Sequence, residues 1–156
     1  MRKSILFSIV AMAFITCAVA PTYGGEVYVI ENSKGNVPVI IQKNPYTLGA
    51  IPELMERKCE GFSFGLMYRY IDGSIGVWKG EIAPNGTICQ HYGPNTWACY
   101  IVEGSGEIMN ASHDLKVQNT IRYGPGDLLA FRPNAMHSWK NGPKKTVFIA
   151  IEQVVP

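Results

Sequence analysis

From Glu26 onward the sequence alternates between short runs of β-branched and aromatic residues and brief turn sequences. The runs include EVYVI at 26–30, FSFGLMYRYI at 62–71, WACYIV at 97–102 and TVFIAIEQVV at 146–155. The turns between them are rich in glycine, proline and asparagine, as in Pro84-Asn85-Gly86. Turn signals at intervals of about 8 to 12 residues are typical of an all-β sandwich or barrel. This pattern excludes most helical and α/β architectures.

The pattern predicts one domain over residues 26–156. The sequence contains no repeat, no low-complexity tract and no interdomain linker, and about 130 residues are enough to bury a core. One short helix is expected near the N-terminal end of this domain, at residues 51–58. Pro52 lies near its start and basic residues lie near its end, as helix termini favour.

The first twenty residues have the pattern of a secretory signal peptide. Arg2 and Lys3 precede an uncharged apolar run that ends in small residues. The run is short for a transmembrane helix, so no stable membrane insertion is expected after processing. We therefore expect residues 1–20 to act as a signal peptide, with cleavage between residues 18 and 25. The mature protein is then expected in the periplasm or outside the cell.

The charge of the chain excludes one class of partner. The full sequence has 14 basic and 12 acidic residues, but two of the basic residues belong to the expected signal peptide. The mature domain would therefore carry equal numbers of each. No cluster of basic residues remains that would attract nucleic acid.

Two stretches in the second half of the chain place a histidine among regularly spaced residues. In the first, His91 is followed by Gly93, Trp97 and Gly104, at offsets of two, six and thirteen residues. In the second, which runs from 123 to 141, Gly126 precedes a further group of residues at offsets of six, eight, eleven and fifteen. These residues are Arg132, Asn134, His137 and Asn141.

The two stretches resemble the paired signatures of the cupin superfamily. The first family motif is Gly, five residues, His-x-His, three or four residues, Glu, six residues and Gly. The second is Gly, five residues, Pro-x-Gly, two residues, His, three residues and Asn. The resemblance covers residues 75–152. It implies an all-β fold of the double-stranded β-helix, or jelly-roll, type for the barrel.

The resemblance also implies which residues could hold a metal. Cupins that bind metal use the two histidines and the glutamate of the first motif and the histidine of the second. Here only His91 and His137 match, because Gly93 and Trp97 occupy the other two positions. An indole N–H donates a hydrogen bond and cannot ligate, and two imidazoles alone make a poor site for a divalent ion. The metal motif is therefore degenerate.

Three cysteines would remain after export, and an odd number indicates one disulfide and one further thiol. If residues 89–99 form a hairpin centred on residue 94, Cys89 lies opposite Cys99 and beside His91. One interpretation is a disulfide between Cys89 and Cys99. A second is a replacement site in which His91, His137, Cys89 and Cys99 bind zinc or copper. A third is a pair of buried cysteines beside hydrogen-bonded histidines.

Two functions follow from these expectations. In the first, the barrel interior binds a small molecule through apolar surface from Tyr92, Trp97 and Trp139, with polar contacts from His91, His137 and Arg132. In the second, the protein is a metal-dependent cupin enzyme of the isomerase, lyase or dioxygenase type, with His91 and His137 as the catalytic candidates. The resemblance to small cupins also implies a homodimer. The sequence leaves the ligand, the metal and the enzyme class open.

Overall fold

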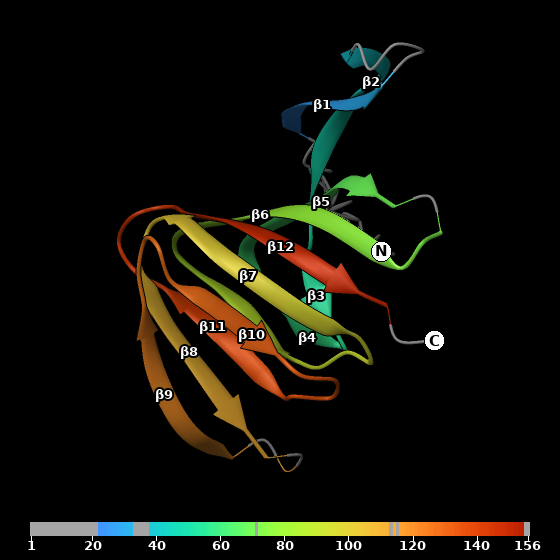
Figure 1. Cartoon of the computed structure of the whole chain (residues 1–156). Coiled ribbons are helices and arrows are strands. Elements are labelled where there is room, and N and C mark those ends of the chain that lie inside the picture. The colour runs from blue at the N-terminus through green and yellow to red at the C-terminus, as the bar shows by residue number, and fades with distance from the viewer. Residues whose placement is uncertain (1–21, 33–37, 71, 113, 115, 155–156) are drawn as a thin grey trace, which may run out of the picture.

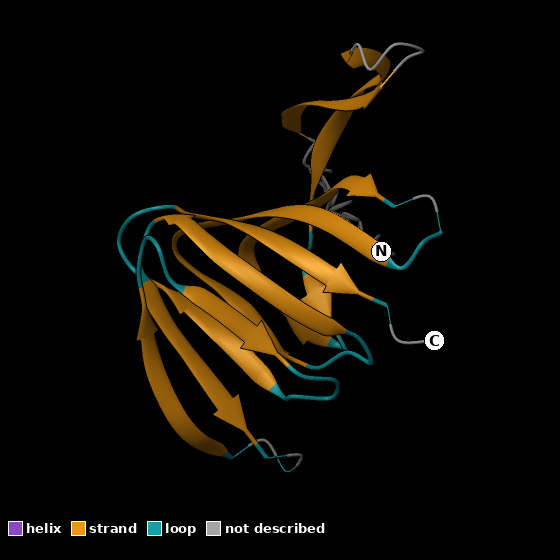
Figure 2. Cartoon of the chain, viewed as in Figure 1, coloured by secondary structure: helices purple, strands orange, loops and turns teal. Residues whose placement is uncertain are grey.

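The computed structural model describes residues 22–32, 38–70, 72–112, 114 and 116–154. The expected signal peptide, residues 1–20, lies outside this part of the chain. The described residues form twelve strands and no helix, which confirms the all-β prediction (Figure 2). Among them, no helix was found that could span a membrane.

The strands follow one another along the chain in the order shown in Figure 1. Their bounds are β1 Thr22–Asn32, β2 Pro38–Ala50, β3 Glu53–Leu54, β4 Arg57–Lys58, β5 Glu60–Arg69, β6 Ile75–His91, β7 Thr96–Glu103, β8 Gly106–Ala111, β9 Val117–Tyr123, β10 Leu128–Phe131, β11 His137–Asn141 and β12 Thr146–Gln153.

Strand β6 is long enough to belong to two facing layers. Its first half pairs with β5 and β12, and its second half pairs with β11. The sequence pattern predicts two separate strands here, at 74–82 and 86–92. Instead the chain bends around Asn85, which has a φ of 57°, and Gly86, where a Cβ would come within 2.5 Å of the Glu60 carbonyl oxygen. Only glycine permits that close approach of two backbones.

The two layers face each other in a jelly-roll arrangement. One layer has the strand order β5–β6–β12–β7–β10, and the other has the order β6–β11–β8–β9. Within the described residues this pairing does not close into a continuous ring, so the barrel is open. Strands β1 and β2 pair with each other and project from the body of the barrel, and β2 pairs with β5 at Gly49 and Ala50 (Figure 1).

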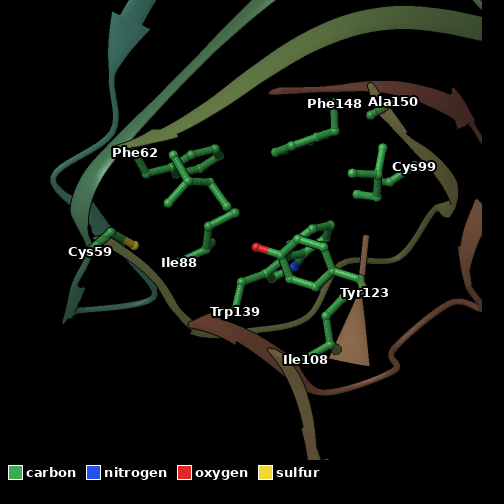
Figure 3. Packing of buried hydrophobic residues seen from close by; sticks show 11 residues of the cluster. Cys59, Phe62, Ile88, Cys99, Ile108, Tyr123, Trp139, Phe148 and Ala150 are labelled. Atoms are coloured by element: carbon green, nitrogen blue, oxygen red, sulfur yellow. The ribbon is translucent and has the colours of Figure 1, made fainter. Parts of the chain in front are cut away.

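The hydrophobic core fills the space between the layers. Ile82 and Ile101 are fully buried, and Trp139 and Phe148 are nearly so. Figure 3 shows side chains from both layers converging there. Strand β12 shows how alternation directs side chains into this core. Phe148 and Ala150 are buried and alternate with the more exposed Ile149 and Ile151, because successive side chains on a pleated strand point to opposite faces.

The expected helix at residues 51–58 is wrong. This segment forms a hairpin of β3 and β4, with positive φ values at Met55 and Glu56 as a two-residue hairpin turn requires. The Cys59 amide donates to the Pro52 carbonyl at 2.7 Å and closes the hairpin. An isolated eight-residue helix is too short to be stable in water, so the contacts of the hairpin with the barrel prevail.

Candidate functional site

A cavity lies between the two layers and is the candidate site. Its volume is about 230 Å³. Most of the residues that line it are apolar or aromatic: Leu54, Phe62, Phe64, Ile88, Tyr92, Gly93, Trp97, Cys99, Phe131, Trp139, Phe148 and Ala150. His91 and His137 complete the lining. Among the described residues, no lysine, arginine, aspartate or glutamate lines the cavity.

The two histidines lie side by side in this cavity. His91 ends β6, His137 begins β11, and the two residues are partners in the pairing of these strands. Their ring centroids are 4.4 Å apart, so the histidines of the two motifs meet in the cavity. On its other side, the His137 ring stacks on Phe131 with a centroid distance of 4.0 Å.

Hydrogen bonds to the backbone fix how each imidazole is protonated. Nδ1 of His91 lies 2.7 Å from the Cys89 carbonyl oxygen, and Nδ1 of His137 lies 2.8 Å from the Ala135 carbonyl oxygen. A carbonyl oxygen only accepts, so each Nδ1 carries the hydrogen. In the neutral ring, Nε2 is then an acceptor with a lone pair.

The surroundings keep both rings neutral. Burial lowers the pKa of His91, although its hydrogen bond to Cys89 opposes this shift. Burial, and to a smaller extent the neighbouring His91, lowers the pKa of His137 to about 4. At neutral pH the cavity therefore presents two uncharged imidazoles.

The structure places three of the four predicted ligand-binding residues at the cavity. Trp97 and Trp139 line it, and Trp139 is buried as expected. Tyr92 lines it too and is 39% exposed. Arg132 is exposed and does not line the cavity, because the turn that follows β10 carries it away.

Phe131 is a cavity residue that sequence reasoning missed. It ends β10, and the alternation Leu129–Phe131 in the run DLLAF places both side chains on the inner face. The signal was therefore present in the sequence. The contact of Phe131 with His137 joins segments six residues apart across a turn, and local alternation does not reveal that turn's shape.

The predicted pairing of Cys89 with Cys99 is wrong. Cys89 forms a disulfide with Cys59, and Cys99 is a free, buried thiol whose pKa burial raises to about 12. The prediction assumed a hairpin centred on residue 94. In the structure, the second half of β6 and β7 lie in different layers, so the connection at 92–95 crosses between layers and does not place the two cysteines opposite each other.

The residues present do not fit the metal centre of the family or the replacement site for zinc or copper. Among the described residues, no three histidine, cysteine or acidic side chains are grouped so that they could hold a metal. Cys89 is occupied by its disulfide, and the Cys99 thiol stays protonated. A divalent ion between His91 and His137 would therefore have no anionic ligand.

The carboxylate that is buried among the described residues, Glu152, is already engaged. Glu152 lies beside Trp97 in the sheet and accepts hydrogen bonds from Arg69 at 3.0 Å, Trp78 at 3.1 Å and Asn95 at 2.7 Å. A carboxylate with three donors and an adjacent guanidinium has little capacity left for a metal. Glu152 therefore anchors the 92–95 connection at one end of the layer.

Asn141, the last residue of the second motif, has a structural role. Its Nδ2 lies within hydrogen-bonding distance of three carbonyl oxygens, those of Ile82 at 3.0 Å, Ala83 at 2.7 Å and Lys144 at 2.8 Å. Its Oδ1 accepts from Thr146 at 2.6 Å. The side chain thus holds the bend of β6 to the turn between β11 and β12, and buried polar groups of this kind are costly to remove.

Comparisons with known proteins connect this arrangement to a fold family. No family model and no curated protein matches the sequence, but solved structures do. A cupin 2 conserved barrel domain protein from Rhodopseudomonas palustris has 12% identity and a TM-score of 0.60, covering 83% of this chain and 81% of its own. The cupin domain of Cnp3 from Schizosaccharomyces pombe has 13% identity and a TM-score of 0.57, covering 85% and 90%.

An enzyme is also among the similar structures. The polyketide cyclase RemF from Streptomyces resistomycificus has 20% identity and a TM-score of 0.51, covering 61% of this chain and 66% of its own. Likenesses at such low identity show the fold alone, since one fold supports many functions. The jelly-roll layers, the paired histidines and these structural likenesses lead to one conclusion: the protein has the fold of the cupin superfamily.

Proposed function

We propose that the protein binds a small, neutral, largely apolar molecule in the cavity between its two layers. The observation that carries this proposal is the cavity of about 230 Å³ with mainly aromatic walls. Sites for drug-sized ligands usually measure about 300 Å³ or more, whereas an apolar cavity of about 150 Å³ can hold benzene. The ligand is therefore on the scale of a single substituted ring.

The lining also supports a neutral ligand over an ionic one. An ion in this cavity would lose its hydration and find no charged partner among the described residues. Such a transfer costs several kcal/mol or more. Arg132, expected from the sequence to supply a polar contact, is exposed and outside the cavity.

An enzyme remains the second candidate, because His91 and His137 are retained and lie 4.4 Å apart. A neutral imidazole could act as a general base towards a bound molecule. The lowered pKa of His137 makes this ring a weak base, and the donor set does not fit the metal-dependent form. These two features favour binding over catalysis.

We also propose that the protein acts outside the cytoplasm. The apolar N-terminal run supports this, as does the Cys59–Cys89 disulfide, since stable disulfides form mainly in oxidising compartments.

Filling the cavity tests the binding proposal. A Cβ at Gly93 would approach only the indole Nε1 of Trp97, at 4.0 Å, so Gly93→Leu should place a side chain in the cavity without a backbone clash. We expect p-cresol and toluene to shift the indole N–H resonances of Trp97 and Trp139 in the parent protein and not in Gly93→Leu.

Gly124→Leu is the matched control. Gly124 lies in the turn before β10 and lines no part of the cavity, and a Cβ added there would meet no atom within 4 Å. This variant should bind both compounds as the parent does. The proposal fails if neither compound binds the parent, or if Gly93→Leu binds them unchanged.

A further inference from the structure

The paired imidazoles of the cavity present two hydrogen-bond acceptors that a ligand can use. Nδ1 of each ring donates to a backbone carbonyl, so neither Nε2 carries a hydrogen. With ring centroids 4.4 Å apart, the two rings cannot hydrogen-bond through their remaining nitrogens, because both of those nitrogens only accept. Among the described residues no buried side-chain nitrogen lacks a partner, so an Nε2 that no protein group contacts is open to solvent. A ligand that displaces this solvent keeps the hydrogen bond only if it carries a polar hydrogen.

Protonation of either ring is disfavoured by its surroundings. Burial lowers the pKa of both histidines, and a charge on His91 opposes a charge on His137. The other titratable side chains that line the cavity are Tyr92 and Cys99, and the Cys99 thiol is neutral because burial raises its pKa to about 12. No anion in the cavity wall stabilises an imidazolium. At neutral pH both rings therefore remain acceptors.

A divalent metal is a poor occupant for this pair. It would gain two imidazole ligands and no anionic ligand from the described residues of the cavity. A hydroxyl group needs no counter-charge and donates its hydrogen along the lone pair of an imidazole. The remaining surface of the cavity is apolar and largely aromatic, with Phe131 stacked on His137 and with Trp97 and Trp139 in the wall, and it suits a flat ring.

We propose that the ligand is a neutral phenol-type compound, whose aromatic ring fills the cavity and whose hydroxyl donates a hydrogen bond to Nε2 of His91 or His137. This inference rests on the proposed function, since it names the ligand class of the same cavity. It adds a selection rule: the cavity prefers a ring with a hydroxyl over the same ring without one.

The selection rule is tested by titrating the mature protein with p-cresol, 4-methylanisole and toluene in the presence of a chelator, again following the indole resonances. These three compounds share a ring and a methyl group, and only p-cresol donates a hydrogen bond. We expect p-cresol to bind at least about tenfold more tightly than the other two, because the two compounds without a donor would displace the solvent that reaches Nε2 and would not replace its hydrogen bond. Any part of the preference that depends on His137 should persist from pH 8 to about 5.5, because burial lowers the pKa of that ring to about 4.

Two variants locate the acceptors. His91→Phe and His137→Phe keep a ring in place and remove Nε2, so at least one of them should lose the preference for p-cresol and keep toluene binding. Tyr92→Phe, which removes a different polar group from the same cavity, should keep the preference. Melting curves show whether each variant is folded, and the comparison of ligands on the parent needs no variant.

The possible outcomes separate the two proposals. Equal binding of p-cresol, 4-methylanisole and toluene would overturn the phenol inference and leave the proposed function standing. The absence of binding by all three would overturn the proposed function itself. A preference for p-cresol that survives both histidine variants, that is lost in Tyr92→Phe, or that appears only without chelator would overturn the role of His91 and His137.

Discussion

Two residues, Gly93 and Trp97, decide which chemistry this cavity supports. They stand where the family pattern has a second imidazole and a carboxylate, and they replace these ligands by backbone and by an indole. The positions of His91 and His137 could be predicted from sequence because motif spacing fixes the pairing of their strands. The state of their nitrogens could not, since it depends on the carbonyl groups of Cys89 and Ala135.

Introducing the two ligands that the family pattern has at positions 93 and 97 should create a metal site. Gly93→His is sterically allowed because only the Trp97 indole lies near its Cβ position, and Trp97→Glu removes that indole and supplies a carboxylate. The double variant would present three imidazoles and one carboxylate, a set suited to manganese or iron. We expect its affinity for Mn²⁺, measured by isothermal titration calorimetry, to exceed that of the parent by orders of magnitude.

The control for this prediction is Gly93→Leu combined with Trp97→Glu, which has the carboxylate without the third imidazole and should bind Mn²⁺ weakly. One equivalent of manganese or iron bound tightly by the parent protein would contradict the prediction. It would mean that the cavity has a ligand beyond those described.

At the scale of elements, local patterns located most strands but not their partners. Strand β6 and the β3–β4 hairpin show why. The bend of β6 depends on contact between Gly86 and the distant Glu60, and the hairpin depends on Cys59 reaching Cys89 across 30 residues of sequence. Alternation and turn residues carry no information about such long-range contacts. The helix at 51–58 and the Cys89–Cys99 pairing were therefore mispredicted together.

The Cys59–Cys89 disulfide should stabilise the barrel and hold the hairpin beside the cavity. Closing a loop of this length restricts the unfolded chain by roughly 3 to 4 kcal/mol in the chain-entropy model. We expect Cys59→Ala combined with Cys89→Ala to lower the free energy of unfolding in urea by about this amount. Because Leu54 of the hairpin lines the cavity, the double variant should also bind p-cresol more weakly.

Cys99→Ala serves as the comparison, because it removes a buried thiol without opening the disulfide. It should lose less stability, and its unfolding should remain sensitive to reductant. If reductant leaves the unfolding curve of the parent unchanged, the disulfide does not contribute in the way proposed.

At the scale of the whole molecule, composition and periodicity were sufficient for the fold class. Side-chain alternation is local, so it can be read from each run separately, and frequent turns leave little room for helices. The assignment of strands to two layers is a property of the complete chain. The two motifs supplied that information here, since the family resemblance places both of them in one barrel, and the structural likenesses confirm the fold.

The proposal that the protein is exported can be tested through the covalent state of the chain, because export removes the signal peptide and allows the disulfide to form. The full sequence has four cysteines, and cleavage between residues 18 and 25 would remove Cys17 with the signal peptide. Protein recovered from the exported fraction of its native host should therefore lack Met1 and hold one disulfide, and it should show one reactive thiol, Cys99, after denaturation without reductant. After reduction, the same sample should show three thiols. Protein kept in the reducing cytoplasm should retain Met1 and show four thiols without added reductant.

Intact mass spectrometry with thiol alkylation measures the N-terminus and the number of thiols at once. An intact Met1 in the soluble exported fraction would refute cleavage, and a mature chain with three free thiols would refute the disulfide while leaving export intact.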